Sequence, residues 1–190
     1  MDLIQYKMPE LVAQAQAGDE QCAGEIFDRY RQAIYRFFTY RVGSREDAED
    51  LTQTTFLEMV MSLHRYRPQP NASFSSWLFR IARHRLIDYY RRKKTTVQLD
   101  GLSATDHPTL QNEMSEPVVD TRIQIIRAQM RRLPEKYQTI LQLTLVEDLS
   151  LHEVAIIMEI SDLHARVLKH RALKKIKGLM PDNSIMYDPL

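Results

Sequence analysis

The stretch from Phe74 to Lys94 combines cationic and aromatic side chains along one predicted helix. It contains a single acid, Asp88, among seven basic residues: Arg80, Arg83, Arg85, Arg91, Arg92, Lys93 and Lys94. Five rings lie among these charges: Phe74, Trp77, Phe79, Tyr89 and Tyr90. Cations that grip phosphate, next to rings on which bases can stack, are typical of single-strand nucleic-acid binding. An amphipathic helix with buried rings and solvated charges fits the same pattern.

The composition indicates a helical protein. Only five glycines occur in 190 residues and apolar residues rarely alternate as they do in strands, so we expect an all-α fold. No run approaches ~18 apolar residues, and the N-terminus lacks a basic region followed by an apolar stretch. We therefore expect no membrane insertion and no signal peptide. The single Cys22 excludes an internal disulfide and fits a reducing cytoplasm.

Charge is segregated along the chain, although the net charge is only +1. Residues 1–94 sum to +3, residues 95–121 to −5 and residues 122–190 to +3. Two basic blocks that flank an acidic connector favour a polyanionic partner. Apolar periodicity also disappears in the connector, and structureless segments of this length are uncommon inside one domain. We predict two small helical domains, 1–94 and 122–179, joined by a flexible acidic linker and followed by a tail, 180–190.

The N-terminal block has the spacing of consecutive helices. Apolar residues between Ile26 and Phe38 recur every three or four positions, and Ser44-Arg-Glu-Asp47 resembles a capping box that starts the next helix. That helix is predicted to bury one face: Ala48, Leu51, Phe56 (or Thr55), Met59, Val60 and Leu63. Pro68 and Pro70 then enforce a loop before the basic and aromatic helix.

The C-terminal block contains two short helices separated by a tight break. Ser150-Leu-His-Glu153 is a strong capping box before an apolar helix, and Glu159-Ile-Ser161 interrupts the pattern. The final helix is basic: Arg166, Lys169, Arg171, Lys174, Lys175 and Lys177. This arrangement predicts a helix-turn-helix, with a generic helical hairpin as the alternative. The one-sided charge favours DNA binding.

No group of residues supports catalysis, a metal or a cofactor. His152-Glu153 begins like a zinc-protease signature, but Ile156 occupies the position of the second His. The pair His84 and Asp88 is more typical of a surface hydrogen bond than of a ligand set. A glycine-rich phosphate loop, a nucleophile elbow and a cysteine cluster are also missing from the sequence. We therefore expect a protein that is not an enzyme and uses no cofactor.

Taken in order, these motifs resemble those of the extracytoplasmic-function (ECF, group 4) sigma factors of bacterial RNA polymerase. Asp47–Phe56 resembles the family's regions 2.1 and 2.2, and Phe74–Arg83 with Ile87-Asp88 resembles regions 2.3 and 2.4. Three segments resemble region 4: Leu133-Pro134, Asp148–Ala155 and Ile160-Ser161. The resemblance implies a subunit that binds core RNA polymerase and directs promoter-specific transcription initiation.

The resemblance assigns three groups of residues to partners. The first would contact the β′ clamp helices of the polymerase: Asp47, Glu49, Asp50 and Gln53. The second would hold the melted −10 element and its flipped bases: Arg67, Asn71, Ser73, Phe74, Arg80, Arg83 and His84. The third would read the −35 duplex in the major groove: Ser161, His164, Arg166, Lys169, His170, Arg171 and Lys174. The β flap and an anti-sigma factor are further implied partners.

Within the opening helix, the resemblance divides the side chains. Trp77, Leu78 and Ile81 are expected mainly in the core, while the cations track the DNA strand and the preceding loop captures the bases. His84 departs from the family pattern, where Asn is frequent, and Leu168 falls where a base-reading Arg is common. Readout of the −35 element is therefore expected to differ from the family pattern or to be weaker.

Two other functions remain open on these residues. A stand-alone helix-turn-helix regulator would bind duplex DNA without polymerase, but it leaves the acidic patch 46–53 unexplained. A sigma-like interaction module would titrate an anti-sigma factor without initiating transcription, which the unusual final helix permits.

Overall fold

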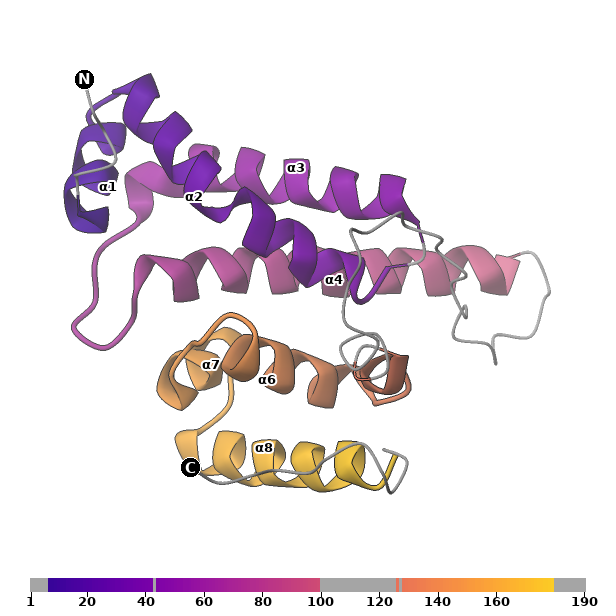
Figure 1. Cartoon of the computed structure of the whole chain (residues 1–190). Coiled ribbons are helices and arrows are strands. Elements are labelled where there is room, and N and C mark those ends of the chain that lie inside the picture. Colours follow the sequence, from indigo (N-terminus) through magenta and orange to yellow (C-terminus); the bar gives the residue numbers. More distant parts are fainter. Residues whose placement is uncertain (1–6, 43, 100–125, 127, 180–190) are drawn as a thin grey trace. The chain divides into compact units, whose positions relative to one another are not determined.

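The computed structural model describes residues 7–42, 44–99, 126 and 128–179, and all regular elements in these ranges are helices. In chain order they are α1 (Met8–Gln16), α2 (Glu20–Thr39), α3 (Arg45–Ser62), the short 3-10 helix η2 (Leu63–Arg65), α4 (Phe74–Leu99), α6 (Glu135–Leu145), α7 (Leu151–Met158) and α8 (Asp162–Lys177) (Figure 1). They form two compact units, one with α1 to α4 and one with α6, most of α7 and α8. The predicted all-α fold with two helical domains is confirmed. No helix in the described ranges is long and apolar enough to cross a membrane.

α4 is longer than the sequence pattern predicts. It continues to Leu99, five residues beyond the predicted end of the first domain at Lys94. The added residues include neither Gly nor Pro, so nothing in them breaks the helix. The rest of the predicted linker, 100–121, and the predicted tail, 180–190, lie outside the described residues.

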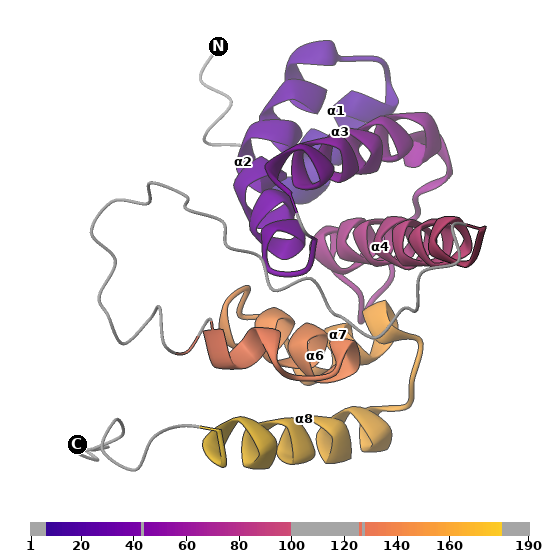
Figure 2. The same ribbon diagram turned by 90° about the vertical axis from the view of Figure 1, so that its right-hand side faces the viewer.

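In the first unit, α3 and α4 lie side by side and antiparallel, while α1 packs on α2 and α2 packs on α3 (Figures 1 and 2). The largest fully buried side chains come from all four helices: Leu11, Ile26, Ile34, Phe37, Phe38, Met59, Leu78, Phe79 and Leu86. Polar groups also tie α4 to α3. The Tyr89 hydroxyl donates to the Asp47 carboxylate at 2.8 Å, and Arg85 Nε lies 2.7 Å from Glu58 Oε2.

The buried face of α3 includes Thr52, which was not predicted, and lacks one predicted residue. Thr55, Phe56 and Met59 are buried, but Val60, predicted to join them, is 56% exposed. Successive residues advance by about 100° around a helix, so Val60 turns away from the line through Thr55 and Met59. α3 therefore carries a second, outward apolar line.

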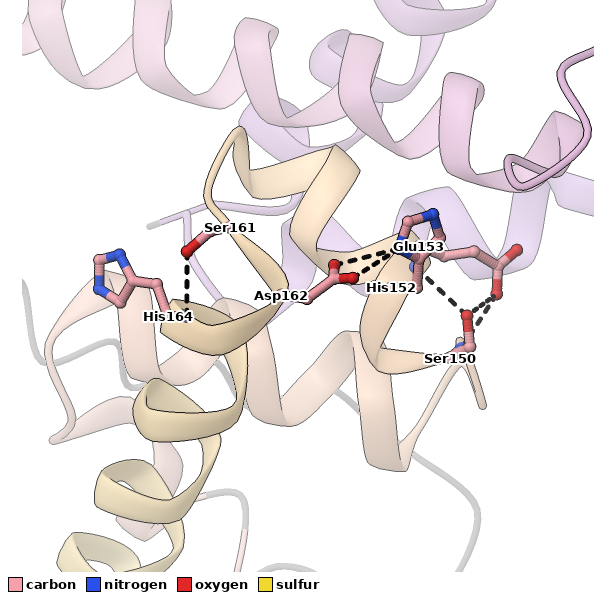
Figure 3. Close-up of polar contacts among 6 residues, drawn as sticks. All are labelled: Ser150, His152, Glu153, Ser161, Asp162 and His164. Atoms are coloured by element: carbon pink, nitrogen blue, oxygen red, sulfur yellow. Dashed lines mark hydrogen bonds and ion pairs between the residues drawn. The ribbon is translucent and has the colours of Figure 1, made fainter.

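Predicted caps begin two of the helices. Ser44 Oγ accepts the Asp47 N–H at 3.0 Å at the start of α3. Before α7, the Glu153 carboxylate accepts the Ser150 N–H at 3.0 Å, and Ser150 Oγ in turn accepts the Glu153 N–H at 3.2 Å (Figure 3). Each bond satisfies an N–H that a helix start leaves without an intrahelical partner.

In the second unit, α6 packs against α8. The buried apolar side chains of this unit follow the predicted helical spacing: Leu133, Ile140, Leu141, Leu143, Val154, Ala155, Ala165, Leu168 and Ala172. Leu168 is only 5% exposed and shares the inward stripe of α8 with Ala165 and Ala172. The expectation that Leu168 replaces a base-reading Arg is wrong, because this position faces the core.

Backbone hydrogen bonds close the turn between α7 and α8. The Ile160 amide donates to the Ala155 carbonyl at 3.0 Å and the Glu159 amide to the Ile156 carbonyl at 3.2 Å, which is the pattern of a Schellman motif. A Schellman motif contains one residue with a left-handed backbone, and here that residue is Glu159, with φ 56°. This conformation costs an L-residue about 1–2 kcal/mol, and glycine adopts it without that cost.

We therefore expect Glu159→Val to be less stable than Glu159→Gly by about 1–2 kcal/mol, because a β-branched side chain crowds the left-handed backbone. Glu159→Gly should be at least as stable as the unmodified chain. Urea denaturation followed by circular dichroism measures both. Equal stability of the two variants would mean that the turn is not held in the left-handed conformation.

Candidate functional site

The start of α8 is fixed by two polar contacts. Ser161 Oγ accepts the His164 N–H at 3.2 Å and caps the helix. His152 Nδ1 on α7 lies 3.0 Å from both carboxylate oxygens of Asp162, in the first turn of α8 (Figure 3). These contacts cap α8 and join its first turn to α7.

The outward side of α8 contains most of the residues predicted to meet −35 DNA. Six of the seven are exposed: Ser161, His164, Arg166, His170, Arg171 and Lys174. Lys169 is half-buried beside the inward stripe, and the Ser161 hydroxyl is engaged in the cap. Sequence reasoning missed Leu163 and Val167, which are 72% and 40% exposed on this side. Their spacing of four residues, apart from the buried stripe, was the available signal.

In the first unit, the loop before α4 is anchored at both ends. Gln16 Nε2 on α1 donates to two backbone carbonyls at the start of the loop, those of Leu63 at 2.8 Å and Tyr66 at 2.9 Å. At the other end, Ser73 Oγ accepts the Ser76 N–H at 3.1 Å. Residues 67–71 between these anchors are exposed.

An aromatic cluster lies beside this loop. The Tyr66 ring centroid is 4.9 Å from that of Trp77 and 5.3 Å from that of Phe74. The Phe74 centroid is in turn 5.7 Å from that of Tyr30. Phe74 is 4% exposed, whereas Tyr66 and Trp77 are partly exposed. Phe74, predicted to line the base pocket, therefore lies in the core. Tyr66 and Trp77 are the accessible rings, and burial raises the pKa of the Tyr66 hydroxyl.

The other predicted −10 residues lie around this cluster. Arg67 and Asn71 are exposed on the loop, and Arg67 Nη1 also donates to the Tyr66 carbonyl at 3.0 Å. On α4, Arg80 comes three residues after Trp77, and His84 comes four residues after Arg80. The three side chains therefore share one side of the helix, and Arg83 lies next to that side. These groups form a continuous path of cations and rings from the loop along α4.

The remaining rings of the opening helix serve the fold. Phe79 is buried against Phe37, with their ring centroids 5.6 Å apart. The Tyr90 hydroxyl donates to the Arg41 carbonyl at 2.7 Å, and Tyr89 bonds to α3 as described above. For the rings, the amphipathic-helix interpretation is therefore largely correct.

A separate surface lies on the outward side of α3. We call it the α3 outer face, and it consists of Asp50, Gln53, Leu57, Val60 and Met61. Leu57, Val60 and Met61 are 62%, 56% and 67% exposed. Neighbouring large apolar side chains left in solvent are typical of protein interfaces. Sequence reasoning missed this line, although residues 56–61 contain more apolar side chains than one helical stripe can bury.

Two of the four predicted polymerase contacts lie on this face. Asp50 and Gln53 are exposed. By contrast, the Asp47 carboxylate accepts the Tyr89 hydroxyl, and Glu49 Oε1 lies 2.6 Å from Arg45 Nε. The Glu49 carboxylate raises the pKa of Arg45 by this hydrogen bond and by its charge. Asp47 thus contributes to packing between α3 and α4.

Comparison with known proteins agrees with this division into two units. Residues 26–96 match the family model of sigma-70 region 2, and residues 130–178 match that of sigma-70 region 4. The ECF RNA polymerase sigma factor SigM of Bacillus subtilis is 31% identical over 157 residues, which cover 82% of this chain and 93% of SigM. The chain belongs to the ECF RNA polymerase sigma factors. SigW of the same organism is 27% identical over 188 residues, covering 94% of this sigma factor and all of SigW.

The fold of this ECF sigma factor is also found in a solved structure. The sigma factor RpoE, in complex with the anti-sigma factor NepR from Bartonella quintana, superposes with a TM-score of 0.68 at 19% identity. The match covers 84% of this chain and 97% of RpoE. By its match to SigM and to the two family models, the protein is an RNA polymerase sigma factor, and the surfaces above are its candidate contacts with polymerase and promoter.

Proposed function

We propose that this ECF sigma factor docks on core RNA polymerase through the α3 outer face, holds the melted −10 element on the loop before α4, and reads the −35 duplex with α8. The docking partner of the first unit would be the β′ clamp helices, and that of the second unit the β flap. The observation that carries the proposal is the exposure of Leu57, Val60 and Met61 beside Asp50 and Gln53. Exposed apolar side chains of this kind mark a protein-binding surface, which binding to duplex DNA does not by itself require.

The −10 assignment rests on the path of cations and rings along the loop and α4. Tyr66 and Trp77 offer partly exposed π faces, and Arg67, Arg80 and Arg83 offer charge to phosphates. Melted bases can stack on such rings because they are no longer paired. Asn71 stands on the exposed loop, where its amide can hydrogen-bond a flipped base.

An anti-sigma factor is a further proposed partner. RpoE, which shares this fold, forms a complex with the anti-sigma factor NepR. In our proposal the sigma factor has no catalytic residues of its own, because the polymerase carries out RNA synthesis. It acts in the cytoplasm, where a protein with the single Cys22 remains reduced.

Run-off transcription with purified bacterial core RNA polymerase tests the proposal. Promoters are first mapped by sequencing the transcripts induced on overexpression of the protein. We expect co-elution with core polymerase and a transcript that requires both proteins. DNA binding without co-elution would favour the stand-alone regulator. Binding to an anti-sigma factor, with neither co-elution nor transcript, would favour the titrating module.

Arg166→Ala is expected to weaken binding of −35 duplex by about 1–3 kcal/mol if Arg166 contacts a base edge. Arg166 is exposed on the outward side of α8, so its removal should leave the fold unchanged. Lys177→Ala, in the last turn, is the control and should weaken all sequences alike through lost phosphate contact. The measurement is competition of holoenzyme binding between matched and mutated −35 duplexes. A uniform loss for Arg166→Ala would reassign this residue to phosphate.

A further inference from the structure

The outward line of α8 begins with apolar side chains. Ala165, Leu168 and Ala172 form the buried stripe, and the residues opposite follow at spacings of three and four: Leu163, Val167, His170 and Lys174. Leu163 is 72% exposed and Val167 is 40% exposed. Neither contributes to the core of the unit, so the fold does not account for apolar residues at these two positions.

Cations surround this apolar pair and continue beyond it. Arg166 flanks it, and His170, Arg171 and Lys174 occupy the following turns. Charge on these turns suits phosphates on either side of a groove. In a recognition helix, the N-terminal residues meet the base edges. The apolar pair therefore occupies the part of α8 that approaches the bases most closely.

The local geometry holds these residues in place. Ser161 caps the helix immediately before them, and His152 Nδ1 lies 3.0 Å from both oxygens of Asp162, the neighbour of Leu163 (Figure 3). Asp162 is thereby oriented toward α7. Between Ser161 and Arg166, the exposed groups are the isobutyl side chain of Leu163 and the imidazole of His164.

The chemistry of the major groove offers one apolar group, the C5 methyl of thymine. All other base edges there present hydrogen-bond donors or acceptors, which an apolar side chain would leave unsatisfied. We propose that Leu163 and Val167 are specificity-determining residues that contact thymine methyls in the −35 element. This inference rests on the proposed function of α8 in −35 recognition and adds which bases it selects.

Deoxyuridine provides the test, since it pairs as thymidine does but lacks the methyl. Holoenzyme selects −35 segments from a random duplex library, and the best duplex is remade with single dT→dU changes in that segment. We expect at least one dT→dU change to weaken binding about fourfold, the value of one buried methyl group. If that thymine contacts Leu163, the dT→dU change should not alter DNA binding by Leu163→Ala holoenzyme. If it contacts Val167, the change should not alter DNA binding by Val167→Ala holoenzyme.

Leu145→Ala is the matched control, because Leu145 is 59% exposed and belongs to α6, not to the recognition helix. This variant should keep the full response to dU. The inference is overturned if dT and dU duplexes bind the unmodified holoenzyme equally, or if both α8 variants keep the fourfold response. If the unmodified holoenzyme selects no −35 sequence from the library, the proposed role of α8 is wrong, and the inference that rests on it is wrong as well.

Discussion

The double substitution Leu57→Glu and Met61→Glu on the α3 outer face is expected to reduce affinity for core RNA polymerase, and promoter-dependent transcription with it, by tenfold or more. Both side chains are more than half exposed, 62% and 67%, so the charged replacements are solvated in the free protein and the fold is kept. On the polymerase, the substitution removes two apolar contacts and buries two carboxylates. Each lost contact is worth about 1.5–3 kcal/mol when fully buried, and about 1.4 kcal/mol corresponds to tenfold in affinity.

The measurement is the dissociation constant of labelled protein and core polymerase, with run-off transcription as the functional readout. Leu163→Glu is the matched control, since Leu163 has a similar exposure of 72% but lies on α8. It should leave core affinity unchanged. If the α3 double variant binds core as tightly as the unmodified protein, docking does not use this face.

Asp47 and Asp50 lie on the same helix but have different surroundings. Asp50 is exposed on the α3 outer face, whereas the Asp47 carboxylate is bonded to Tyr89 on α4. Both acids stand in the motif that resembles regions 2.1 and 2.2, and the sequence separates them only by place, since an acid in the first helical turn, such as Asp47, also suits the helix dipole. The structure shows that Asp47 belongs to the fold, because its hydrogen-bond partner, Tyr89, lies 42 residues away in the chain.

Local patterns explain why so much of the fold could be predicted. Ser44 and the pair Ser150 and Glu153 form the predicted caps, because a cap depends on residues within one turn. The break at 159–161 was predicted for the same reason. The left-handed conformation of Glu159 was not, since the residue type there is not glycine and the turn is imposed by its hydrogen bonds.

The errors concern which side of a helix is covered by its neighbours. Periodicity identifies an apolar stripe, but Val60 belongs to a second stripe on α3 that no helix in the described part of the first unit covers. The family resemblance predicts that Leu168 replaces a base contact, although its spacing from Ala165 and Ala172 places it in the core. For Val60 the missing information is long-range packing, whereas for Leu168 the local periodicity was available and a motif compared position by position does not use it.

Phe74 illustrates the same limit and leads to the second large effect. Phe74→Ala is expected to lower the free energy of unfolding of the first unit by about 3–5 kcal/mol, the usual cost of truncating a buried Phe. The ring is 4% exposed and contacts Tyr30, Tyr66 and Trp77. Since small proteins are stable by only about 5–15 kcal/mol in total, this loss should impair every DNA-binding step at once.

Trp77, the only tryptophan of the chain, reports this loss directly, because its ring centroid is 5.3 Å from that of Phe74. The midpoint of urea unfolding followed by tryptophan fluorescence should fall sharply in Phe74→Ala. Phe74→Leu, which retains most of the volume, should lose much less. An unchanged midpoint in Phe74→Ala would show that the cluster is loose and that the ring is free to leave it.

Asn71→Ala separates base capture from stability, which Phe74→Ala cannot do. Asn71 is exposed on the loop, so its truncation should change stability by less than about 0.5 kcal/mol. We expect closed-complex affinity to stay within about twofold, and permanganate reactivity of the melted −10 thymines to fall about tenfold, the equivalent of one hydrogen bond lost to a flipped base. Gln32→Ala, which removes an exposed amide from α2, is the control. Equal losses in closed and open complexes for Asn71→Ala would place base capture elsewhere, with the accessible rings of Tyr66 and Trp77 as the next positions to test.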